Sequence, residues 1–343
     1  LSAFPLTIVG AALSAWAPDY PWLMLGQLLI GMGCAPAFLA CTVFISRHFP
    51  HARFAFVSGV AMGVGGLGLL FTGTPLAWLV ERAGWRSGFV LLAALSALAW
   101  LLIWRRVHEP ALPGPAPERE HWGTAVRRFG ALFVLPHSLG IVLLGMVAYA
   151  SFLALRGLWI GPMLIERYGF TLVGAGNMAV AMSLISLFSP ALFGRIDPGP
   201  TRRRRWVVNC SLGISALYLG VGLAPHAWLN LALVLAISVL SGYSILLYSD
   251  VRSSYPPDLT GRALSLYTMA MFLGVALMQS LTGWVAGWAQ AHGIEPYRAV
   301  MATIAAALAL GSTAFRFLPA SPLLHQHSAQ DAGQTRNLDR NSL

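Results

Sequence analysis

The sequence predicts an all-α protein that crosses a membrane many times. Of its 343 residues, 57% are hydrophobic and 10% are charged, whereas a soluble domain has about 45–50% and about 25%. The mean hydropathy is +0.68. Such a chain cannot cover a water-facing surface, which disfavours a soluble enzyme, a disordered protein and a nucleic-acid-binding domain. The apolar runs are about 20 residues long, the length of a spanning helix rather than of a barrel strand.

Apolar stretches long enough for a spanning helix occur ten times. In chain order they are 1–17, 22–46, 54–79, 87–104, 138–165, 172–194, 206–223, 227–249, 261–288 and 297–317. A charged, Pro-rich segment divides them into four and six. We therefore expect an incomplete N-terminal bundle at 1–104, a cytoplasmic linker at 105–137, a C-terminal six-helix bundle at 138–318 and a disordered cytoplasmic tail at 319–343.

The net charge of +10 comes from arginine, because the chain has no lysine. If residue 1 lies on the cytoplasmic side, seventeen arginines fall in gaps and tail on that side and four fall on the other. This bias predicts an inner-membrane protein with both ends of the chain in the cytoplasm. Cys34, Cys41 and Cys210 lie in apolar runs. No cysteine or histidine spacing suggests a disulfide framework, a metal site or another cofactor.

The two halves of the chain resemble each other. Arg53 and Arg262 follow a polar loop after one span, and Arg86 and Arg298 follow the next, with offsets of 209 and 212 residues. An internal repeat about an axis along the membrane normal is typical of transporters. Under this offset the fifth and sixth stretches have no partners, so we expect two spans to precede Leu1 in the complete protein.

Three segments resemble the major facilitator superfamily, a family of twelve-span secondary transporters. Gly194-Arg-Ile-Asp197, followed by Arg202-Arg-Arg-Arg205, resembles the family's cytoplasmic loop motif between its eighth and ninth spans. The run from Gly26 to Arg53 resembles its fourth span and the following loop, and Gly84-Trp-Arg86 resembles its short outer loop after the fifth. The resemblance covers residues 1 to about 318. It implies a two-bundle fold, alternating access, and ten visible spans that correspond to the family's third to twelfth.

A substrate cavity would have six candidate residues, which are Gln27, Tyr149, Arg156, Trp159, Ser241 and Tyr248. Arg156 lies only about 6 Å outward of the middle of its stretch, and an ionisable group at that depth is a functional candidate. Tyr149 and Trp159 share its helical face, and Pro162 could break the helix beyond it. The alternative is that Arg156 extends to the headgroups. Serines such as Ser241 commonly bond their own helix backbone instead of substrate.

Two further groups concern conformation. The resemblance implies a gating role for Gly194, Asp197, Arg202 and Arg203, in which Asp197 holds charges near a helix end; the alternative is that these arginines only set topology. Gly59 and Gly63, followed by Pro75, predict close helix packing. Asp250, at the end of its stretch, is expected to be solvated.

We therefore expect a transporter of small solutes, with organic anions favoured by Arg156. The alternatives are a drug or metabolite efflux permease and, from a different class, a non-transporting sensor or inactive remnant. An enzyme is disfavoured, because no paired acid, histidine or cysteine groups lie at depth. No acidic residue lies deep in a stretch, although a proton-coupled carrier commonly needs one. Either such a group lies in the two spans expected before Leu1, or the protein is not proton-coupled, so a coupling ion is an open alternative. The expected partners are a small-molecule substrate and the lipid bilayer, with no nucleic acid, and the expected state is a monomer.

Overall fold

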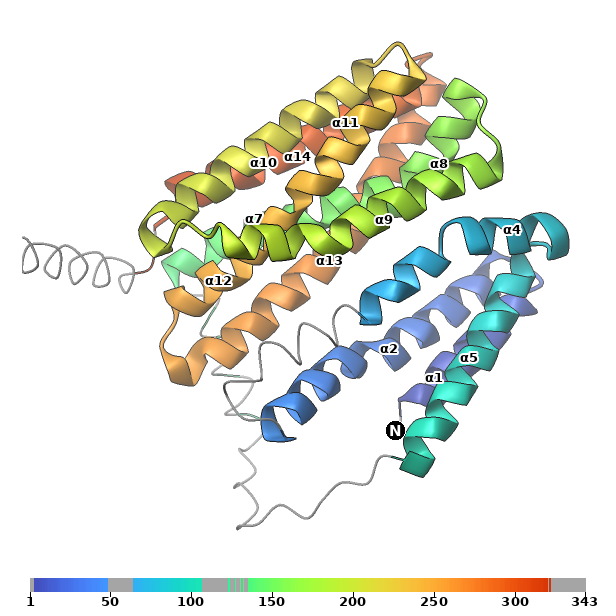
Figure 1. Ribbon diagram of the computed structural model, residues 1–343, viewed down its shortest axis with the longest axis horizontal. Helices are drawn as coiled ribbons and strands as arrows, with labels where there is room; N and C mark the ends of the chain where they lie inside the picture. The colour runs from blue at the N-terminus through green and yellow to red at the C-terminus, as the bar shows by residue number, and fades with distance from the viewer. Residues whose placement is uncertain are drawn as a thin grey trace, which may run out of the picture. The chain divides into compact units, whose positions relative to one another are not determined.

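The computed structural model (Figure 1) describes residues 3–48, 64–106, 135–319 and 321, with single residues at 123, 127, 130 and 132. Every regular element in this part of the chain is a helix, which confirms the all-α prediction. The chain forms two compact units. Unit 1 comprises Leu1–Glu118 with Thr171–Val180, and unit 2 comprises Arg119–Phe170 with Ala181–Leu343. The domain limits drawn from the sequence stay a prediction.

Among the described residues, eight helices are long and apolar enough to cross a membrane. They are Val64–Ala83, Trp85–Arg106, His137–Arg167, Leu172–Arg195, Arg202–Leu223, Ala227–Ser254, Leu259–Ala291 and Pro296–Phe317. Each overlaps one of the predicted spans from 54–79 onward. Their outer faces expose large apolar side chains such as Leu95, Phe188 and Leu310. Lipid can cover such faces without a free-energy cost, because hydrocarbon tails are as apolar as the side chains.

Unit 1 contains four named helices. They are α1 (Phe4–Ala15), α2 (Tyr20–His48), α4 (Thr74–Ala83) and α5 (Trp85–Arg106). α1 packs against both α2 and α5, and α4 packs against α5. The first two predicted spans thus coincide with helices, although α1 has only 12 residues.

Close helix packing in unit 1 occurs at glycines that the sequence reasoning had not selected for packing. A Cβ atom on Gly26 would overlap Ser14, and a Cβ atom on Gly33 would overlap Thr7, so α1 and α2 approach closely at both points. Small residues allow such approach in lipid. The predicted packing residues Gly59 and Gly63 lie outside the described residues. Pro75 is exposed and is the second residue of α4, where its missing N–H costs no hydrogen bond.

The helices of unit 2 begin with α7 (Pro136–Ala154), η1 (Leu155–Trp159), α8 (Ile160–Pro162), η2 (Met163–Arg167) and α9 (Leu172–Arg195), whose first turns belong to unit 1. They continue with α10 (Pro200–Leu223), α11 (Ala227–Leu240), η3 (Ser241–Tyr243), α12 (Ser244–Ser254), α13 (Pro257–Ala291) and α14 (Pro296–Phe317). The segments η1 and η2 are π-helical, and η3 is a 3₁₀-helix. α10 and α14 lie side by side (Figure 1).

α7 packs against both α13 and α14. Glycines again mark the tight points: a Cβ atom on Gly274 would overlap the backbone of Met146, and one on Gly311 would overlap the side chain of Val147. Because α13 and α14 both pack against α7, they fix the position of η1, which follows α7 directly, within unit 2.

Candidate functional site

The span that begins with α7 changes its helical form beyond the middle. α7 is α-helical, whereas η1 and η2 are π-helical, with the short α8 between them. Pro162, the last residue of α8, lacks an amide hydrogen, and its ring crowds the carbonyl four residues earlier, so regular α-helical bonding cannot continue through it. The sequence predicted a break at Pro162 but not its form. π-helical turns are frequent at functional sites, and Arg156 lies in the first of them.

Arg156 is a buried cation at membrane depth. Its side chain and backbone together are 8% exposed. The Nε–H donates to the Oγ of Ser183, on α9, over 2.9 Å. The guanidinium is therefore enclosed by helices of unit 2 and anchored to a second helix. Sequence reasoning missed Ser183, because no local pattern shows which serine of another helix an arginine will reach.

Tyr149 lies near this guanidinium, and Tyr248 lies near Tyr149. Tyr149 interacts electrostatically with Arg156 and also with Tyr248. The Tyr149 ring packs edge-on against Phe272, with ring centres 6.3 Å apart. The Tyr248 ring packs edge-on against Tyr267, with ring centres 4.8 Å apart. The tertiary structure thus groups Tyr149, Arg156 and Tyr248, which come from α7, η1 and α12.

Trp159 connects the π-helical segment to α13. Its indole N–H donates to the Oγ1 of Thr282 over 3.0 Å, and Thr282 in turn donates to the carbonyl oxygen of Met278 over 2.8 Å. The Trp159 ring also packs edge-on against Tyr297, with centres 6.2 Å apart. Because Trp159 is the last residue of η1, these contacts fix the end of η1 that lies farther from α7.

The two other cavity candidates make local contacts. Ser241 lies in η3, and its Oγ donates to the carbonyl oxygen of Ile237 over 2.6 Å. Gln27 is an exposed residue of unit 1, and its Nε2 donates to the Oγ of Ser14 over 3.3 Å. A role in substrate binding stays a prediction for both residues.

A second buried arginine lies where α10 begins. Arg203 is 7% exposed, and its guanidinium grips the Asp197 carboxylate with Nε at 3.0 Å from Oδ1 and Nη2 at 2.7 Å from Oδ2. Its Nη1 donates to the carbonyl oxygen of Ser249 and to the Oγ of Ser253, both on α12. This arginine therefore joins the loop before α10 to the end of α12.

The Asp197 carboxylate is adapted to this position. Burial alone would raise its pKa, but the hydrogen bonds and charge of Arg203 and the N–H of Gly199 outweigh burial and hold the pKa below its ordinary value. Gly199 has a φ of +81°, a conformation that favours glycine. The carboxylate also lies at the positive end of the α10 dipole. Both effects favour the charged form of Asp197.

Only part of the predicted gating motif comes together. Asp197 and Arg203 form an ion pair, whereas Gly194 and Arg202 are exposed. The sequence interpretation of Asp250 was wrong: this residue is 3% exposed and not solvated, and its Oδ1 has no hydrogen-bond partner among the residues that the structure describes. It interacts electrostatically with Arg203 and Arg204. Its burial follows from the packing of α12 against α10 and α13, which hydropathy does not reveal.

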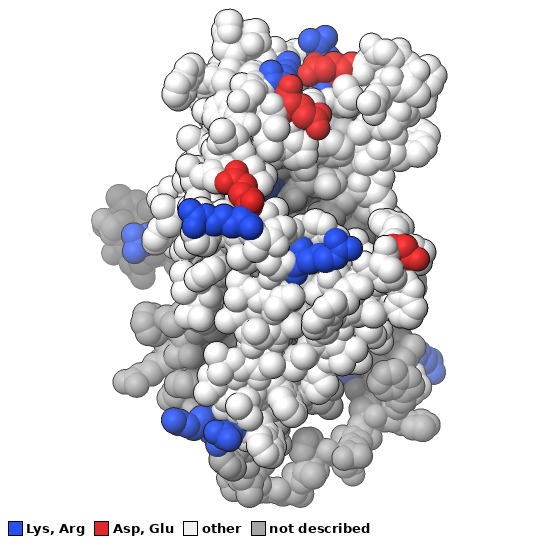
Figure 2. Space-filling view, turned by 90° about the vertical axis from the view of Figure 1, so that its right-hand side faces the viewer, with Lys and Arg blue, Asp and Glu red and all other residues white. Residues whose placement is uncertain are grey.

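The opposite end of unit 2 carries a separate polar network. Arg167 donates to the carbonyl oxygens of Val221 and Gly222 and pairs with Glu295 at 3.2 Å. Tyr297 donates to the Glu166 carboxylate. Figure 2 shows a face that is mostly uncharged, on which acidic side chains lie beside basic ones. The hydrogen bonds of Arg167 pair backbone carbonyl groups at the end of α10 and join that end to η2. The contacts of Glu295 and Tyr297 join η2 to the start of α14.

No cluster of three or more histidine, cysteine or acidic residues that could hold a metal ion occurs within the described ranges. The arrangement offers instead the buried Arg156 with aromatic neighbours, and an ion pair in the loop between α9 and α10. Such groups can bind and orient a small charged molecule.

Comparison with known proteins identifies the family. A sequence model of the Major Facilitator Superfamily matches residues 1–277. The chain belongs to this family. It is therefore a multi-pass membrane protein of a transporter family, and the resemblance noted in the sequence is confirmed.

Solved structures of transporters share the fold. A D-xylose–proton symporter has a TM-score of 0.67 and 16% identity, covering 94% of this chain and 80% of the symporter. A nucleoside transporter has the same TM-score and identity, with coverages of 92% and 81%. A bacterial homologue of the human lysosomal transporter Spinster has a TM-score of 0.64 and 16% identity, with coverages of 92% and 81%.

One curated relative matches part of the sequence. The mouse protein "Solute carrier family 2, facilitated glucose transporter member 10" is 29% identical over 104 residues, which is 28% of this chain. The match spans only 19% of the length of that relative.

Proposed function

We propose that the protein is a secondary transporter of small organic anions that works by alternating access in the inner membrane, with both ends of this chain in the cytoplasm. The observation that carries the proposal is the buried guanidinium of Arg156 near the middle of a span. A charge at this depth costs several kcal/mol, roughly 2.5–3.5 on insertion scales. A carboxylate or phosphate on the substrate would offset that cost on each transport cycle.

The neighbours of Arg156 support a small organic substrate. Ser183 holds the Nε of the guanidinium, which fixes the plane in which an anion would meet it. Tyr149 and Trp159 flank it in sequence and offer aromatic faces to the organic part of a ligand. Gln27, Ser241 and Tyr248 are the further residues that we assign to the cavity. Asp197 and Arg203 are proposed to stabilise one conformation of the cycle.

Neutral solutes form the competing class. The structural relatives include a xylose symporter and a nucleoside transporter, and the curated relative is named as a glucose transporter. The structural relative that transports D-xylose is named as a proton symporter, so a coupling proton is included in the proposal. A drug or metabolite efflux permease and a non-transporting sensor are the remaining alternatives.

The decisive experiment compares Arg156→Gln with Arg156→Lys in proteoliposomes that contain the purified chain. A panel of carboxylates, phosphate esters and neutral sugars serves as substrate. We expect the unmodified chain to take up at least one anion, Arg156→Gln to lose that uptake by more than tenfold, and Arg156→Lys to retain part of it, because lysine keeps the charge but not the fork of donors.

Anion uptake with unchanged affinity in Arg156→Gln contradicts the assignment of the site. Transport of neutral sugars alone contradicts the substrate class. If no solute moves, thermal stabilisation of the chain by the same anions is measured instead; its absence would favour the non-transporting alternative.

A further inference from the structure

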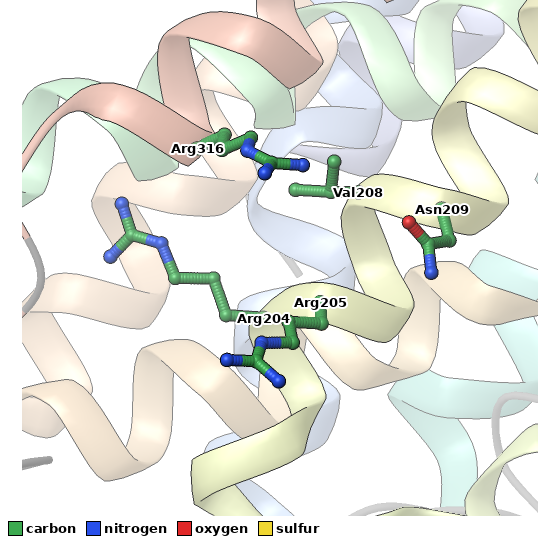
Figure 3. A pocket seen from close by; sticks show the side chains of 5 residues that line it. All are labelled: Arg204, Arg205, Val208, Asn209 and Arg316. Carbon is green, nitrogen blue, oxygen red and sulfur yellow. The ribbon is translucent and has the colours of Figure 1, made fainter.

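A basic pocket lies at one end of unit 2, away from Arg156. Its volume is about 340 Å³, and its lining residues are Arg204, Arg205, Val208, Asn209 and Arg316. Figure 3 shows that four of them come from the start of α10, whereas Arg316 comes from the end of α14. Three arginine side chains from two helices therefore line one small space.

The three arginines have different roles in the pocket. Arg204 donates to the carbonyl oxygens of Phe315 and Leu318, so it holds the C-terminal end of α14. Arg204 also interacts electrostatically with Asp250. Arg205 and Arg316 are exposed, and within the described ranges neither forms an ion pair with a carboxylate.

The three arginines favour an anion in the pocket and outweigh the negative dipole end of α14, which lies beside Arg316. Arg205 lies within the first two turns of α10, where the helix dipole is positive. Two exposed guanidinium groups at that place repel each other, and the described residues that line the pocket include no acidic side chain. An anion bound between them would remove this repulsion and supply the acceptors that guanidinium groups require.

The surface next to the pocket indicates what kind of anion fits. From the pocket, exposed residues continue along α10 at helical spacing: Arg205, Asn209, Leu212, Ala216, Leu219 and Leu223. A matching exposed row continues along α14: Arg316, Thr313, Leu310, Ala306 and Ala302. Both rows are almost wholly apolar beyond the first two residues. Trp206 and Phe317 are exposed at the level of the pocket, as aromatic residues at a membrane interface often are.

We propose that the pocket binds the phosphate group of an anionic phospholipid, with the acyl chains lying along the exposed rows of α10 and α14. Basic pockets between membrane helices on the cytoplasmic side are suited to anionic headgroups. A free phosphate would use the arginines but not the apolar rows, which begin at the pocket and run toward the other end of the span. By the arginine bias of the sequence, the lipid belongs to the cytoplasmic leaflet.

Native mass spectrometry of the delipidated chain tests the proposal. Phosphatidylglycerol and phosphatidylcholine with the same acyl chains are added in equal amounts. We expect one tightly retained phosphatidylglycerol. The double variant Arg205→Gln/Arg316→Gln should weaken it by about 30-fold, because each arginine near an anionic lipid contributes about fivefold. A matched double variant, Arg195→Gln/Arg252→Gln, removes two exposed arginines from α9 and α12 and should change the affinity less than twofold.

Several outcomes would overturn the proposal. Equal losses in the two double variants would mean that only the overall charge matters. Equal retention of the two lipids would exclude headgroup recognition. Displacement of the lipid by millimolar glycerol 3-phosphate or inorganic phosphate would identify a soluble anion as the ligand. If the double variant does not fold, the single variant Arg316→Gln is used, with an expected loss of about fivefold and the same contradicting results.

Discussion

Arg156 and Arg203 are both buried in unit 2, at 8% and 7% exposure, yet their surroundings differ. Arg203 lies at the end of its span, where it grips both oxygens of Asp197 and reaches Ser249 and Ser253. Arg156 lies near the middle of its span in a π-helical turn, where a serine hydroxyl accepts from its Nε and tyrosine lies nearby.

The difference separates a structural cation from a functional one. The bidentate ion pair with Asp197 and two hydrogen bonds to α12 offset the free-energy cost of burying the Arg203 charge. We therefore expect Arg203 to stabilise the fold. Arg156 lies near the middle of a span beside Tyr149, so we expect it to serve a ligand. A residue retained for function often costs stability.

The largest effect is expected for Arg203→Ala. This change leaves the Asp197 carboxylate without its partner and removes the cation that acts on buried Asp250. We expect the free energy of unfolding to fall by about 3–5 kcal/mol. Thermal unfolding in detergent measures it, with the exposed neighbour Arg202→Ala as the control. Equal losses of stability in the two variants would show that the buried Arg203 does not stabilise the fold more than the exposed Arg202 does.

Asp197→Asn should have the next largest effect, with a loss of about 1.5–3 kcal/mol at neutral pH, because a charge-assisted bond becomes a neutral one. Because the pKa of Asp197 is lowered in the folded protein, its charge contributes fully above the ordinary value of 3.8. The contribution disappears as the pH falls through the lower folded-state value. The stability difference between the two proteins should therefore be constant above pH 5 and shrink below about pH 3.8.

The gating proposal adds a functional readout for the same variant. Asp197→Asn should abolish transport at normal abundance in the membrane. Unchanged uptake kinetics would contradict a gating role and leave the ion pair with a purely structural one.

Ser183→Ala tests the anchor of Arg156. Loss of one hydrogen bond to a charged donor should weaken anion affinity by about five- to tenfold, equivalent to about 1–1.4 kcal/mol. Ser186→Ala, on the same helix, is the matched control, because its hydroxyl donates to the backbone carbonyl oxygen of Ser183. The measurement is ligand-induced thermal stabilisation. Equal losses in both variants would show that Ser183 acts through α9 and not through Arg156.

The smallest effect on stability is expected for Arg156→Gln. Removal of a charge from membrane depth should change the free energy of unfolding by less than about 1 kcal/mol, or increase it. Thermal unfolding beside Arg203→Ala gives the comparison directly. A loss as large as that of Arg203→Ala would make Arg156 a structural residue.

The sequence predicted most of the fold, because spanning segments are a property of local composition. Each of the eight candidate spans overlaps a predicted stretch. The loop motif also brought attention to Asp197 and Arg203 before any contact was known. These inferences need only windows of hydropathy and a short pattern, neither of which depends on the neighbours of a helix.

The run Arg202–Arg205 shows where this reasoning ends. Successive residues of a helix point about 100° apart, so four arginines in a row must face four directions. Arg203 meets the loop and α12, Arg204 meets α14, and the other two are exposed. The sequence motif pointed to gating for both Arg202 and Arg203, and it did not reveal that Arg203 is buried whereas Arg202 is exposed.

The sequence by itself determined that this chain is a helical membrane protein, where its eight candidate spans lie, and that Arg156 lies near the middle of one of them. Its family also followed from short motifs and their order. The tertiary structure alone decided the π-helical turns, the burial of Asp250, the contact of Arg156 with Ser183 and the pocket between α10 and α14. The physical reason is that hydropathy reports how much of a helix avoids water, whereas the direction in which each side chain points has meaning only once a neighbouring helix is in place.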